Sequence, residues 1–435
     1  MMRMSICFKA LDLTLSVQIE ENEFNLQVDK VFDLGCRVNP KRSFLFVSKL
    51  IGKHLPVVPD LPRATGYLLA EKMIRARHGV KHFDTNTLVD FVHHPTHNYP
   101  ELKALFEQRY PLTENTLFIG FAETATGLGH SVYSAFKDAS YIHTTREPIQ
   151  GEPYFEFKEP HSHATDHACY FKQPSMLSEA EHIVLIDDEI TTGNTAINLI
   201  RALHEKSPKK RYTVLSILDW RKPHEKEAFI QLGKELNADV AVLSLLSGEF
   251  QVDRDIELAY EEEVVKTDSN FFPTEALRLF PRIIATNKHN ELPISYPVHS
   301  GRFGMDEDIQ QEFDCHMDHI ASHILASRSQ GKILVLSFGE FMYVPSRIAS
   351  HLGENVYVKT VTRSPIYPHA TDYPIYERYA FIDDDGVTNY LYNISKEQYD
   401  QVFFILERNI SDKTKSVIYS ILQQCGVRKV RFVLV

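Results

Sequence analysis

The chain has 435 residues, of which 43% are hydrophobic and 24% are charged, and its formal net charge is −11. This length and composition are typical of a globular protein with two or more cores and exclude a disordered chain. The acidic balance excludes general binding to nucleic acid or to a membrane surface, which needs Lys and Arg clustered over one face. The five cysteines lack CxxC spacing and no apolar run reaches bilayer length, so we expect a soluble cytoplasmic protein with reduced thiols.

In chain order, the first predicted element is an antiparallel hairpin within residues 1–30, because 13–20 and 24–28 alternate between apolar and polar residues. Short apolar strands then alternate with helical segments, which is typical of a parallel α/β sheet. These strands are expected at 116–122, 182–188, 212–220 and 239–248.

An acidic and proline-punctuated segment, 256–292, predicts a connector between a first domain, 1–255, and a second domain, 293–435. The second domain shows the same alternation of apolar strands and helices. Its strands are expected at 332–338, 355–361, 378–385, 401–407 and 430–435. We therefore predict an α/β fold with two sheets.

The most informative segment is IVLIDDEITTGNTAINLI, residues 183–200. Ligands bind outside the carboxyl ends of parallel strands, which is where Asp187 and Asp188 emerge. Carboxylates at that edge can accept hydrogen bonds from vicinal hydroxyls, directly or through Mg²⁺. The loop that follows enters a helix whose N-terminus favours a phosphate, and it consists of Thr191, Thr192, Gly193, Asn194 and Thr195. The pattern predicts a sugar phosphate site; the plainer alternative is a simple helix cap.

VLIDDEITTGNT resembles the phosphoribosyl pyrophosphate (PRPP) signature of type I phosphoribosyltransferases. The resemblance implies that fold, a parallel sheet flanked by helices. It also implies that Asp187 and Asp188 hold the ribose 2′ and 3′ hydroxyls and Mg²⁺, and that residues 191–195 hold the 5′-phosphate. Glu189 stands where many members have an apolar residue, and its role stays open.

Upstream segments resemble further parts of this family's site. FIGFAETATGLGHSVYSAF, residues 118–136, resembles the pyrophosphate loop, which would consist of Glu123, Thr124, Ala125, Thr126 and Gly127. IHTTREP places Arg146 at a strand end, where the family has a cation near the pyrophosphate. DLGCRVNPKRSFLF, residues 33–46, resembles a Gly-x-Arg-x-x-Pro stretch of orotate phosphoribosyltransferases, so Arg37 would contact the acceptor base. A helix entry and a solvated arginine are the plainer alternatives for the first two.

Residues 147–171 occupy the place where the family has a flexible loop that closes over the active site. His161, His163 and His167 lie in this segment. We favour a lid whose donors, His163 foremost, reach the departing pyrophosphate and exclude water. A zinc site is a second interpretation, since imidazoles at this spacing can converge on Zn²⁺. A solvent-exposed loop is the third.

The second half of the chain repeats features of the first. A shift of 217 residues lays LFIGFAE (117–123) on LVLSFGE (334–340), which matches Glu123 with Glu340. The same shift lays TREP on TRSP, residues 362–365, which contains Arg363 and Ser364. At another offset LIDDE (185–189) lies on FIDDD (381–385), and VHSGRFG, with Arg302, echoes the Gly-x-Arg stretch. We hypothesise that the second half is a degenerate copy of the first.

The proposed copy lacks the phosphate loop, because GVTNYLYN follows Asp383, Asp384 and Asp385 without Thr-Thr-Gly-x-Thr. We therefore do not expect it to bind PRPP in the ordinary way. FIDDDGVT is also typical of the start of a haloacid-dehalogenase-type phosphatase, but only fifty residues follow Asp385, too few for the rest of that fold.

The C-terminal segments HSGRFG, SFGEFMYVPSRIA and VKTVTRSPIYP resemble the TRSP domain, which accompanies phosphoribosyltransferases of bacterial tellurite-resistance and stress gene clusters. The resemblance implies a Mg²⁺-dependent enzyme that transfers ribose phosphate from PRPP to a base-like acceptor, for biosynthesis of a nucleoside-like metabolite. The expected partners are PRPP and that acceptor, without nucleic acid or membrane; a homodimer is left open.

Two rival functions remain. One is a non-catalytic sensor of PRPP or a nucleotide. In the other, the second half binds acceptor or product through Arg302, Glu340, Arg363, Ser364, Asp383 and Asp384.

Overall fold

The computed structural model describes residues 4–11, 13–37, 43–153, 155–157, 167–254, 258, 262–267, 274–277, 280–369 and 373–435. The first half is built on a seven-stranded sheet. In spatial order its strands are β1 (Met4–Ala10), β2 (Leu13–Glu21), β11 (Asp239–Val252), β10 (Arg211–Asp219), β9 (His182–Ile190), β5 (Tyr110–Gly120) and β6 (Phe136–His143). β11, β10, β9, β5 and β6 pair in parallel, which confirms the predicted α/β class.

Helices accompany this sheet because its strands are apolar on both faces, as parallel strands with covered faces are. In β9, residues 183–186 are fully buried. The helix α7 that follows is amphipathic and buries Ala196, Ile197, Leu199, Ile200 and Leu203. The helices of this half are α1 (Val28–Val31), α2 (Leu61–His78), α3 (Thr85–His93), α4 (Pro100–Phe106), α5 (Thr126–Tyr133), α6 (Ser175–Glu179), α7 (Asn194–Lys206) and α8 (Pro223–Leu236).

The N-terminal hairpin exists, but one of its predicted strands is wrong. β2 pairs with β1, which lies upstream of it, and not with 24–28. Phe24, Leu26 and Val28 are indeed buried, but Asn25 has a φ of 54° that interrupts an extended chain. The alternation of residues 24–28 therefore reflects contact with the core without a strand.

The second half contains a five-stranded sheet, whose spatial order is β12 (Thr274–Ala276), β20 (Lys429–Leu434), β19 (Gln401–Leu406), β15 (Ile333–Phe338) and β16 (Val356–Val361). Neighbouring strands are parallel throughout. Its helices are the short 3-10 helix η1 (Val298–Ser300), α9 (Glu307–Leu325), α10 (Tyr343–Ser350) and α11 (Asp412–Gln424). β12 lies inside the segment expected to be a connector.

The two sheets share a strand order. β10-β9-β5-β6 in the first sheet corresponds to β20-β19-β15-β16 in the second. The helix after β5 is α5 and the helix after β15 is α10, while α7 and α11 follow β9 and β19. The strand that matches β9 is therefore β19.

The predicted alignment of FIDDD with LIDDE is wrong. Residues 378–382 form β17, which pairs antiparallel with β18 (Thr388–Tyr392) in a separate hairpin. This hairpin follows β16 as the hairpin of β7 (Phe155–Phe157) and β8 (His167–Cys169) follows β6. Asp383 consequently lies in a hairpin turn and not at the end of a central parallel strand, which also removes the phosphatase-like interpretation.

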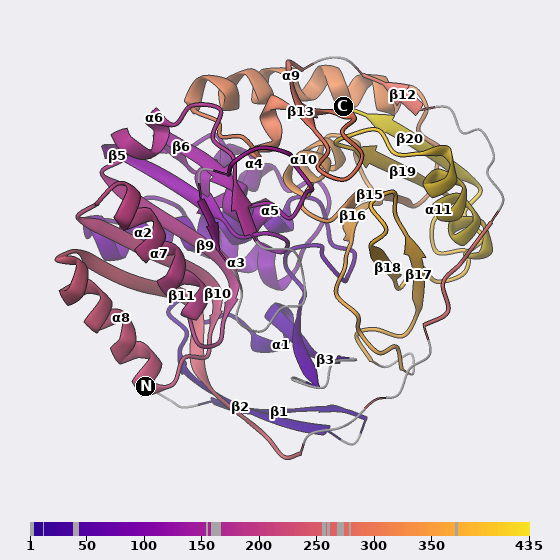
Figure 1. Cartoon of the computed structure of the whole chain (residues 1–435). Helices are drawn as coiled ribbons and strands as arrows, with labels where there is room; N and C mark the ends of the chain where they lie inside the picture. Colours follow the sequence, from indigo (N-terminus) through magenta and orange to yellow (C-terminus); the bar gives the residue numbers. More distant parts are fainter. Residues whose placement is uncertain are drawn as a thin grey trace.

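The halves lie side by side, with α9 running across the top of both (Figure 1). Each extends an edge of the other's sheet: Met305 exchanges two backbone hydrogen bonds with Tyr141 of β6, and Val57 does so with Val358 of β16. One hydrophobic cluster runs through both halves, from Ala10 to Val435. The halves thus fold against each other as one unit.

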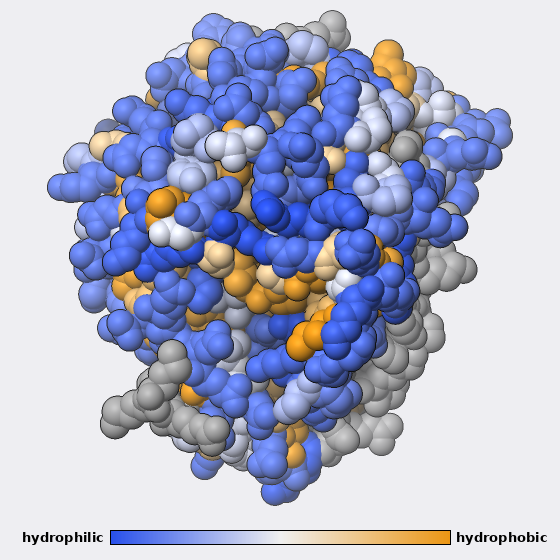
Figure 2. All heavy atoms as spheres, turned by 90° about the vertical axis from the view of Figure 1, so that its left-hand side faces the viewer, coloured by the Kyte–Doolittle hydropathy of each residue, from blue (hydrophilic) through white to orange (hydrophobic). Residues whose placement is uncertain are grey.

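Two further hairpins complete the described structure, β3 (Phe32–Cys36) with β4 (Phe44–Ser48) and β13 (Arg282–Thr286) with β14 (Pro293–Pro297). On the face shown in Figure 2, polar side chains predominate and apolar ones gather in a hollow near its centre. No helix within the described residues combines the length and the apolar character that crossing a membrane requires.

Candidate active site

Asp187 and Asp188 lie where β9, the strand between β5 and β10, reaches the carboxyl edge of the sheet. The buried run of β9 ends at these residues, and Asp187, Asp188 and Glu189 are half-buried. The backbone N–H of Asp188 donates to Oδ1 of Asp187 at 2.9 Å. Two adjacent carboxylates therefore stand at the edge where parallel sheets bind ligands.

The loop after these acids ends at Gly193, where α7 begins. Gly193 has a φ of 78°, and a Cβ at this position would lie 2.4 Å from the Phe229 ring, so only glycine fits. Gly193 itself has no side chain to cap this helix, and the backbone N–H of Asn194 donates to the Thr192 hydroxyl at the long distance of 3.4 Å. Thr191, Thr192 and Thr195 are half-buried. Since the first N–H groups of a helix have no partner inside it, this N-terminus is suited to an anion.

The predicted pyrophosphate loop divides into an open part and a covered part. Thr124 is half-buried and its Oγ1 accepts a hydrogen bond from Nζ of Lys53. Thr126 is buried and its hydroxyl donates to the backbone oxygen of Glu340 at 2.7 Å. A Cβ on Gly127 would lie 2.7 Å from Cβ of Met342, and Ala125 is fully buried. Only the start of the loop, Glu123 and Thr124, is left for a ligand.

Lys53 is a cation of this site that the sequence did not indicate. It lies in an irregular segment before α2, 71 positions from Thr124. No motif surrounds it, so its position follows only from the tertiary fold.

Arg146 follows β6 at the same edge of the sheet, and its position is fixed from the second half of the chain. Its backbone N–H donates to Oε1 of Glu340 at 2.6 Å, and the Thr145 hydroxyl donates to Oε2 at 2.7 Å. Its guanidinium Nη2 lies 2.8 Å from Nε2 of His167. Glu340 therefore orients the chain that carries Arg146.

The predicted histidine loop is only partly described. His161 and His163 lie outside the described residues, while His167 is 1% exposed on β8. Its Nδ1 is 3.1 Å from the Thr144 hydroxyl. Among the described residues no group of three or more His, Cys, Asp or Glu side chains could hold a metal ion.

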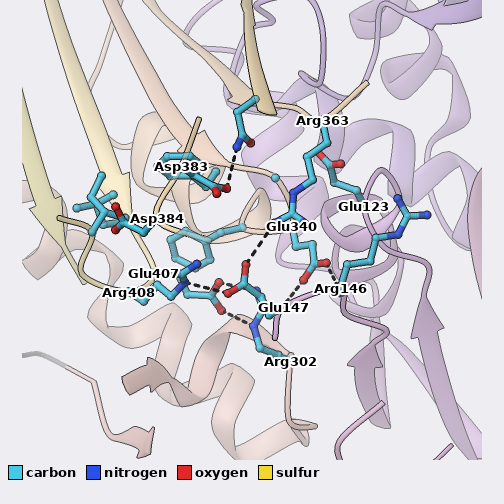
Figure 3. Close-up of a pocket in the computed structure, with 16 residues that line it drawn as sticks. Glu123, Arg146, Glu147, Arg302, Glu340, Arg363, Asp383, Asp384, Glu407 and Arg408 are labelled. Atoms are coloured by element: carbon cyan, nitrogen blue, oxygen red, sulfur yellow. Dashed lines mark hydrogen bonds and ion pairs between the residues drawn. The ribbon is translucent and has the colours of Figure 1, made fainter. Parts of the chain in front are cut away.

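A buried ion network joins the two halves beside Arg146 (Figure 3). Arg302 is 1% exposed and forms ion pairs with Glu340 and, at 2.6 Å, with Glu407. Burial alone would raise the pKa of Glu340. The charge of Arg302 and the hydrogen bonds that Glu340 accepts lower this pKa to about 2. Burial opposes the charge of Arg302, yet Glu407 and Glu340 raise its pKa well above the usual value. Arg302 is thus a structural centre of the domain contact.

The acids of the β17–β18 hairpin bind to the protein itself. Oδ2 of Asp384 accepts from the backbone N–H of Ser411 at 2.7 Å, and its Oδ1 accepts from the hydroxyls of Ser411 and Thr414. Ser411 is the N-cap of α11. Asp383 accepts from Nδ2 of Asn389 at 2.8 Å. The carboxylate of Asp384 therefore occupies the N-terminus of α11, where a phosphate would otherwise fit.

The remaining predicted residues lie at the domain contact. Arg37 forms an isolated backbone bridge with Ile366 of the second half. Arg363 is 24% exposed and its guanidinium is 3.9 Å from the Glu147 carboxylate. The backbone oxygen of Ser364 accepts from the Tyr392 hydroxyl at 2.5 Å. Arg37 thus contacts the segment that follows the TRSP motif.

A mainly parallel sheet, an acid pair at the end of one of its strands and a helix N-terminus beside it together suit a ligand that carries hydroxyls and a phosphate. Comparison with protein-family models matches residues 31–249 to a family described as phosphoribosyl transferase. A second match covers residues 299–422, described as the TRSP domain C-terminal to that transferase. Since the first match spans half of the chain, the chain belongs to this phosphoribosyltransferase family.

Solved structures with a similar fold include three phosphoribosyltransferases. Adenine phosphoribosyl transferase from Trypanosoma brucei, in complex with AMP, pyrophosphate and ribose-5-phosphate, is 12% identical with a TM-score of 0.32, over 53% of this chain and 82% of that chain. The Leishmania tarentolae adenine enzyme is 19% identical with a TM-score of 0.22, over 42% and 87%. A Staphylococcus aureus hypoxanthine enzyme is 10% identical with a TM-score of 0.20, over 45% and 79%. A search among curated proteins found no match.

Proposed function

We propose that the first half of this phosphoribosyltransferase binds PRPP with Mg²⁺ and transfers its ribose 5-phosphate to a small base-like acceptor, releasing pyrophosphate. The observation that carries the proposal is the N-terminus of α7, with glycine at its N-cap, directly after the acid pair. Asp187 and Asp188 bind the ribose hydroxyls, while the loop from Thr191 to Thr195 binds the 5′-phosphate.

The residues near the acid pair fit a Mg²⁺ ion. Two adjacent carboxylates offer oxygen ligands, and no further cluster of metal ligands exists in the described part of the chain. This suits Mg²⁺, which binds through one or two carboxylates and takes its other ligands from phosphates and water. When bound, Mg²⁺ neutralises negative charge on the pyrophosphate. Asp187 and Asp188 are the residues that would hold it.

The protein's own part in the reaction is to bind, orient and neutralise. As the bond from ribose C1 to pyrophosphate breaks, charge builds on the leaving oxygens. Lys53 donates to Thr124 at the open start of the pyrophosphate loop, Arg146 lies at the same edge of the sheet, and Glu340 orients the chain that carries Arg146. The hairpin of β3 and β4, with Arg37 directly after β3, orients the acceptor base. His163 serves as a lid donor to pyrophosphate.

We further propose that the second half is a degenerate copy of the first. The common strand order supports this. Gly120 pairs with Ile186 and Leu336 with Phe404, so under the shift of 217 residues Asp188 corresponds to Glu407. Glu407 is engaged by Arg302 and the α11 N-terminus by Asp384. The copy therefore binds no PRPP and positions Arg146 instead.

The biological setting is proposed on general grounds. All five cysteines are free thiols, which suits a reducing compartment such as the cytoplasm. We infer biosynthesis of a nucleoside-like metabolite from the combination of a phosphoribosyltransferase with a TRSP domain.

Calorimetric titration of PRPP in the presence of Mg²⁺ tests the proposal. Wild type should bind in the micromolar class, and Asp187→Asn combined with Asp188→Asn should weaken binding by about 100-fold or more. The matched control is Asp308→Asn with Asp318→Asn, two exposed acids of α9, which should bind as wild type does. Equal affinity in both double variants would contradict the proposed site.

Release of pyrophosphate separates an enzyme from a sensor. Wild type should release pyrophosphate from PRPP when a suitable nucleobase is supplied from a panel, and the Asp187→Asn, Asp188→Asn variant should not. PRPP binding without pyrophosphate release for any base would instead favour a non-catalytic sensor.

A further inference from the structure

A cavity opens where the carboxyl edges of the two sheets meet (Figure 3). The centre of a water-sized molecule can occupy about 50 Å³ of it. Glu123, Arg146 and Glu147 line it from the first half, and the TRSP half supplies the rest of its wall. Asp187, Asp188 and the 191–195 loop do not line it, whereas Glu123 and Arg146 place it next to the proposed pyrophosphate end of the PRPP site.

Most charged groups of this cavity already have close partners. Arg302 is bound by Glu340 and Glu407. Arg408 is bound by Glu147, at 2.8 Å, and by Asp385. These groups therefore form the walls and are not available to a ligand without breaking buried ion pairs.

Two groups of opposite charge, the Glu123 carboxylate and the Arg363 guanidinium, can still form a close hydrogen bond with a ligand. Glu123 is 7% exposed, and its Oε1 has no hydrogen-bond partner within the described part of the chain. Arg363 has, among the described residues, a single ion pair, to Glu147 at the long distance of 3.9 Å. Figure 3 shows both side chains at the same end of the cavity. A buried carboxylate without a donor costs free energy, which a ligand with a donor group recovers.

The lining restricts the kind of ligand. Among the described residues, its carboxylates form no group of three or more that could hold a metal ion through protein ligands alone. Six carboxylates face four guanidinium groups, a negative balance that disfavours phosphate or pyrophosphate. The uncharged wall is mainly apolar, with Phe338, Phe341, Leu406 and Ile410, and also contains Asn389, whose amide donates to Asp383.

We propose that this cavity binds a small zwitterion with an apolar side chain, of which an apolar α-amino acid is the simplest example. Its ammonium group donates to Glu123, its carboxylate accepts from Arg363, and its side chain packs on the apolar wall. Each of the two charges forms a charge-assisted hydrogen bond in a site shielded from water. No residue assigned to the ribose or its 5′-phosphate takes part, and only Glu123 is shared with the proposed pyrophosphate loop.

Calorimetry with L-phenylalanine as the probe tests this site on the full chain. Phenethylamine, which lacks the carboxylate, and 3-phenylpropanoate, which lacks the ammonium group, are the matched half-ligands. L-Phenylalanine should bind at millimolar concentration or below, and each half-ligand should bind about tenfold more weakly or worse. L-Leucine tests whether the apolar wall accepts an aliphatic side chain.

Arg363→Gln should weaken L-phenylalanine binding about tenfold or more, while PRPP binding stays at the wild-type level. Arg431→Gln is the control, because Arg431 is an arginine of the same half, 49% exposed on β20, and it should change nothing. Glu123→Gln provides a second variant if Arg363→Gln fails to fold, and it should weaken binding similarly.

The proposal is overturned if wild type binds neither amino acid, or if Arg363→Gln binds L-phenylalanine as wild type does. It is also overturned if 3-phenylpropanoate binds as tightly as L-phenylalanine, since the cavity is then an anion site. Normal PRPP binding alongside any of these results would leave the proposed transferase function intact.

Discussion

The N-cap of α7 is a glycine and the single side-chain hydrogen bond described at this end is a long one to Thr192, whereas the N-terminus of α11 is closed by Ser411 and by the carboxylate of Asp384. The two helices follow corresponding strands, β9 and β19. A carboxylate at α11 thus stands where the first half leaves room for a phosphate. An anion site can persist in a fold after its ligand is replaced by a side chain.

Two glutamates at corresponding positions show the same contrast. Glu340 accepts hydrogen bonds from Thr145, from the backbone of Arg146 and from Arg302. In Glu123, Oε1 has no such partner in the described structure. In the second half Glu340 forms contacts within the protein, whereas under the proposed function the acids of the first half bind ligands.

The largest effect is expected from Glu340→Gln. This change removes the carboxylate that joins Arg302 of the second half to Thr145 and Arg146 of the first half. Removing one partner of a buried ion pair costs about 3–5 kcal/mol of the free energy of unfolding. Glu275→Gln removes a half-exposed pair with Arg431 and should cost at most about 1 kcal/mol. Urea denaturation measures both, and equal losses would show that Glu340 does not hold the halves together.

The open helix end is tested by Gly193→Ala. A Cβ there meets the Phe229 ring at 2.4 Å in a left-handed conformation, so we expect a loss of about 1–3 kcal/mol and weaker PRPP binding. Gly79→Ala, at a φ of 69° with nothing within 4 Å, isolates the backbone effect at about 1 kcal/mol. Thermal unfolding and PRPP titration of both variants make the comparison; unchanged PRPP affinity in Gly193→Ala would count against the loop.

The closed helix end is tested by Asp384→Ala. Loss of the Asp384 carboxylate from the N-terminus of α11 should lower the free energy of unfolding by about 0.5–2 kcal/mol. PRPP binding should be unaffected, because the second half has Glu407 at the position of Asp188 and lacks the acid pair. Asp308→Ala, in the first turn of α9 but not its cap, should cost less than about 1 kcal/mol. If Asp384→Ala gained a second PRPP site, the second half would be a masked copy and not a degenerate one.

An effect that is absent at neutral pH and grows on acidification comes from His130 between the halves. His130 is buried, stacks on Tyr343 at 3.7 Å and lies 2.9 Å from Gln310. Burial lowers its pKa to about 3. Because folding lowers the pKa of His130, the neutral imidazole stabilises the folded state fully above pH 6.5. The free energy of unfolding then falls by about 1 kcal/mol per pH unit as the pH decreases toward 3.

His130→Phe keeps a ring at this position and should flatten that part of the stability profile. His224→Phe, at a histidine with a 76% exposed side chain, should leave the profile unchanged. Denaturation at several pH values measures the slopes, and an unchanged slope in His130→Phe would show that His130 already titrates normally.

The sequence predicted the parts of the molecule that depend on local order. The buried run 183–186, the acids after it and the loop to α7 form one continuous segment, so their arrangement follows from strand, turn and helix signals. FIDDD was misplaced because an antiparallel hairpin strand can show the same apolar run and acidic end as a parallel one.

Other features could not be predicted because they depend on distant contacts. Lys53 reaches Thr124 from an irregular segment, and Asp384 reaches Ser411 across 27 positions. Neither contact leaves a periodic or spacing signal. The pairing of Glu340 with Arg146 likewise exists only once the two halves are packed together.

The most direct test of the central claim is the number of PRPP molecules bound per chain, measured by equilibrium dialysis with labelled PRPP and Mg²⁺. The account predicts one molecule per chain for wild type and for Asp384→Ala, and none for Asp187→Asn combined with Asp188→Asn. Two molecules per wild-type chain, or one retained by the double variant, would contradict the assignment of PRPP binding to the first half alone.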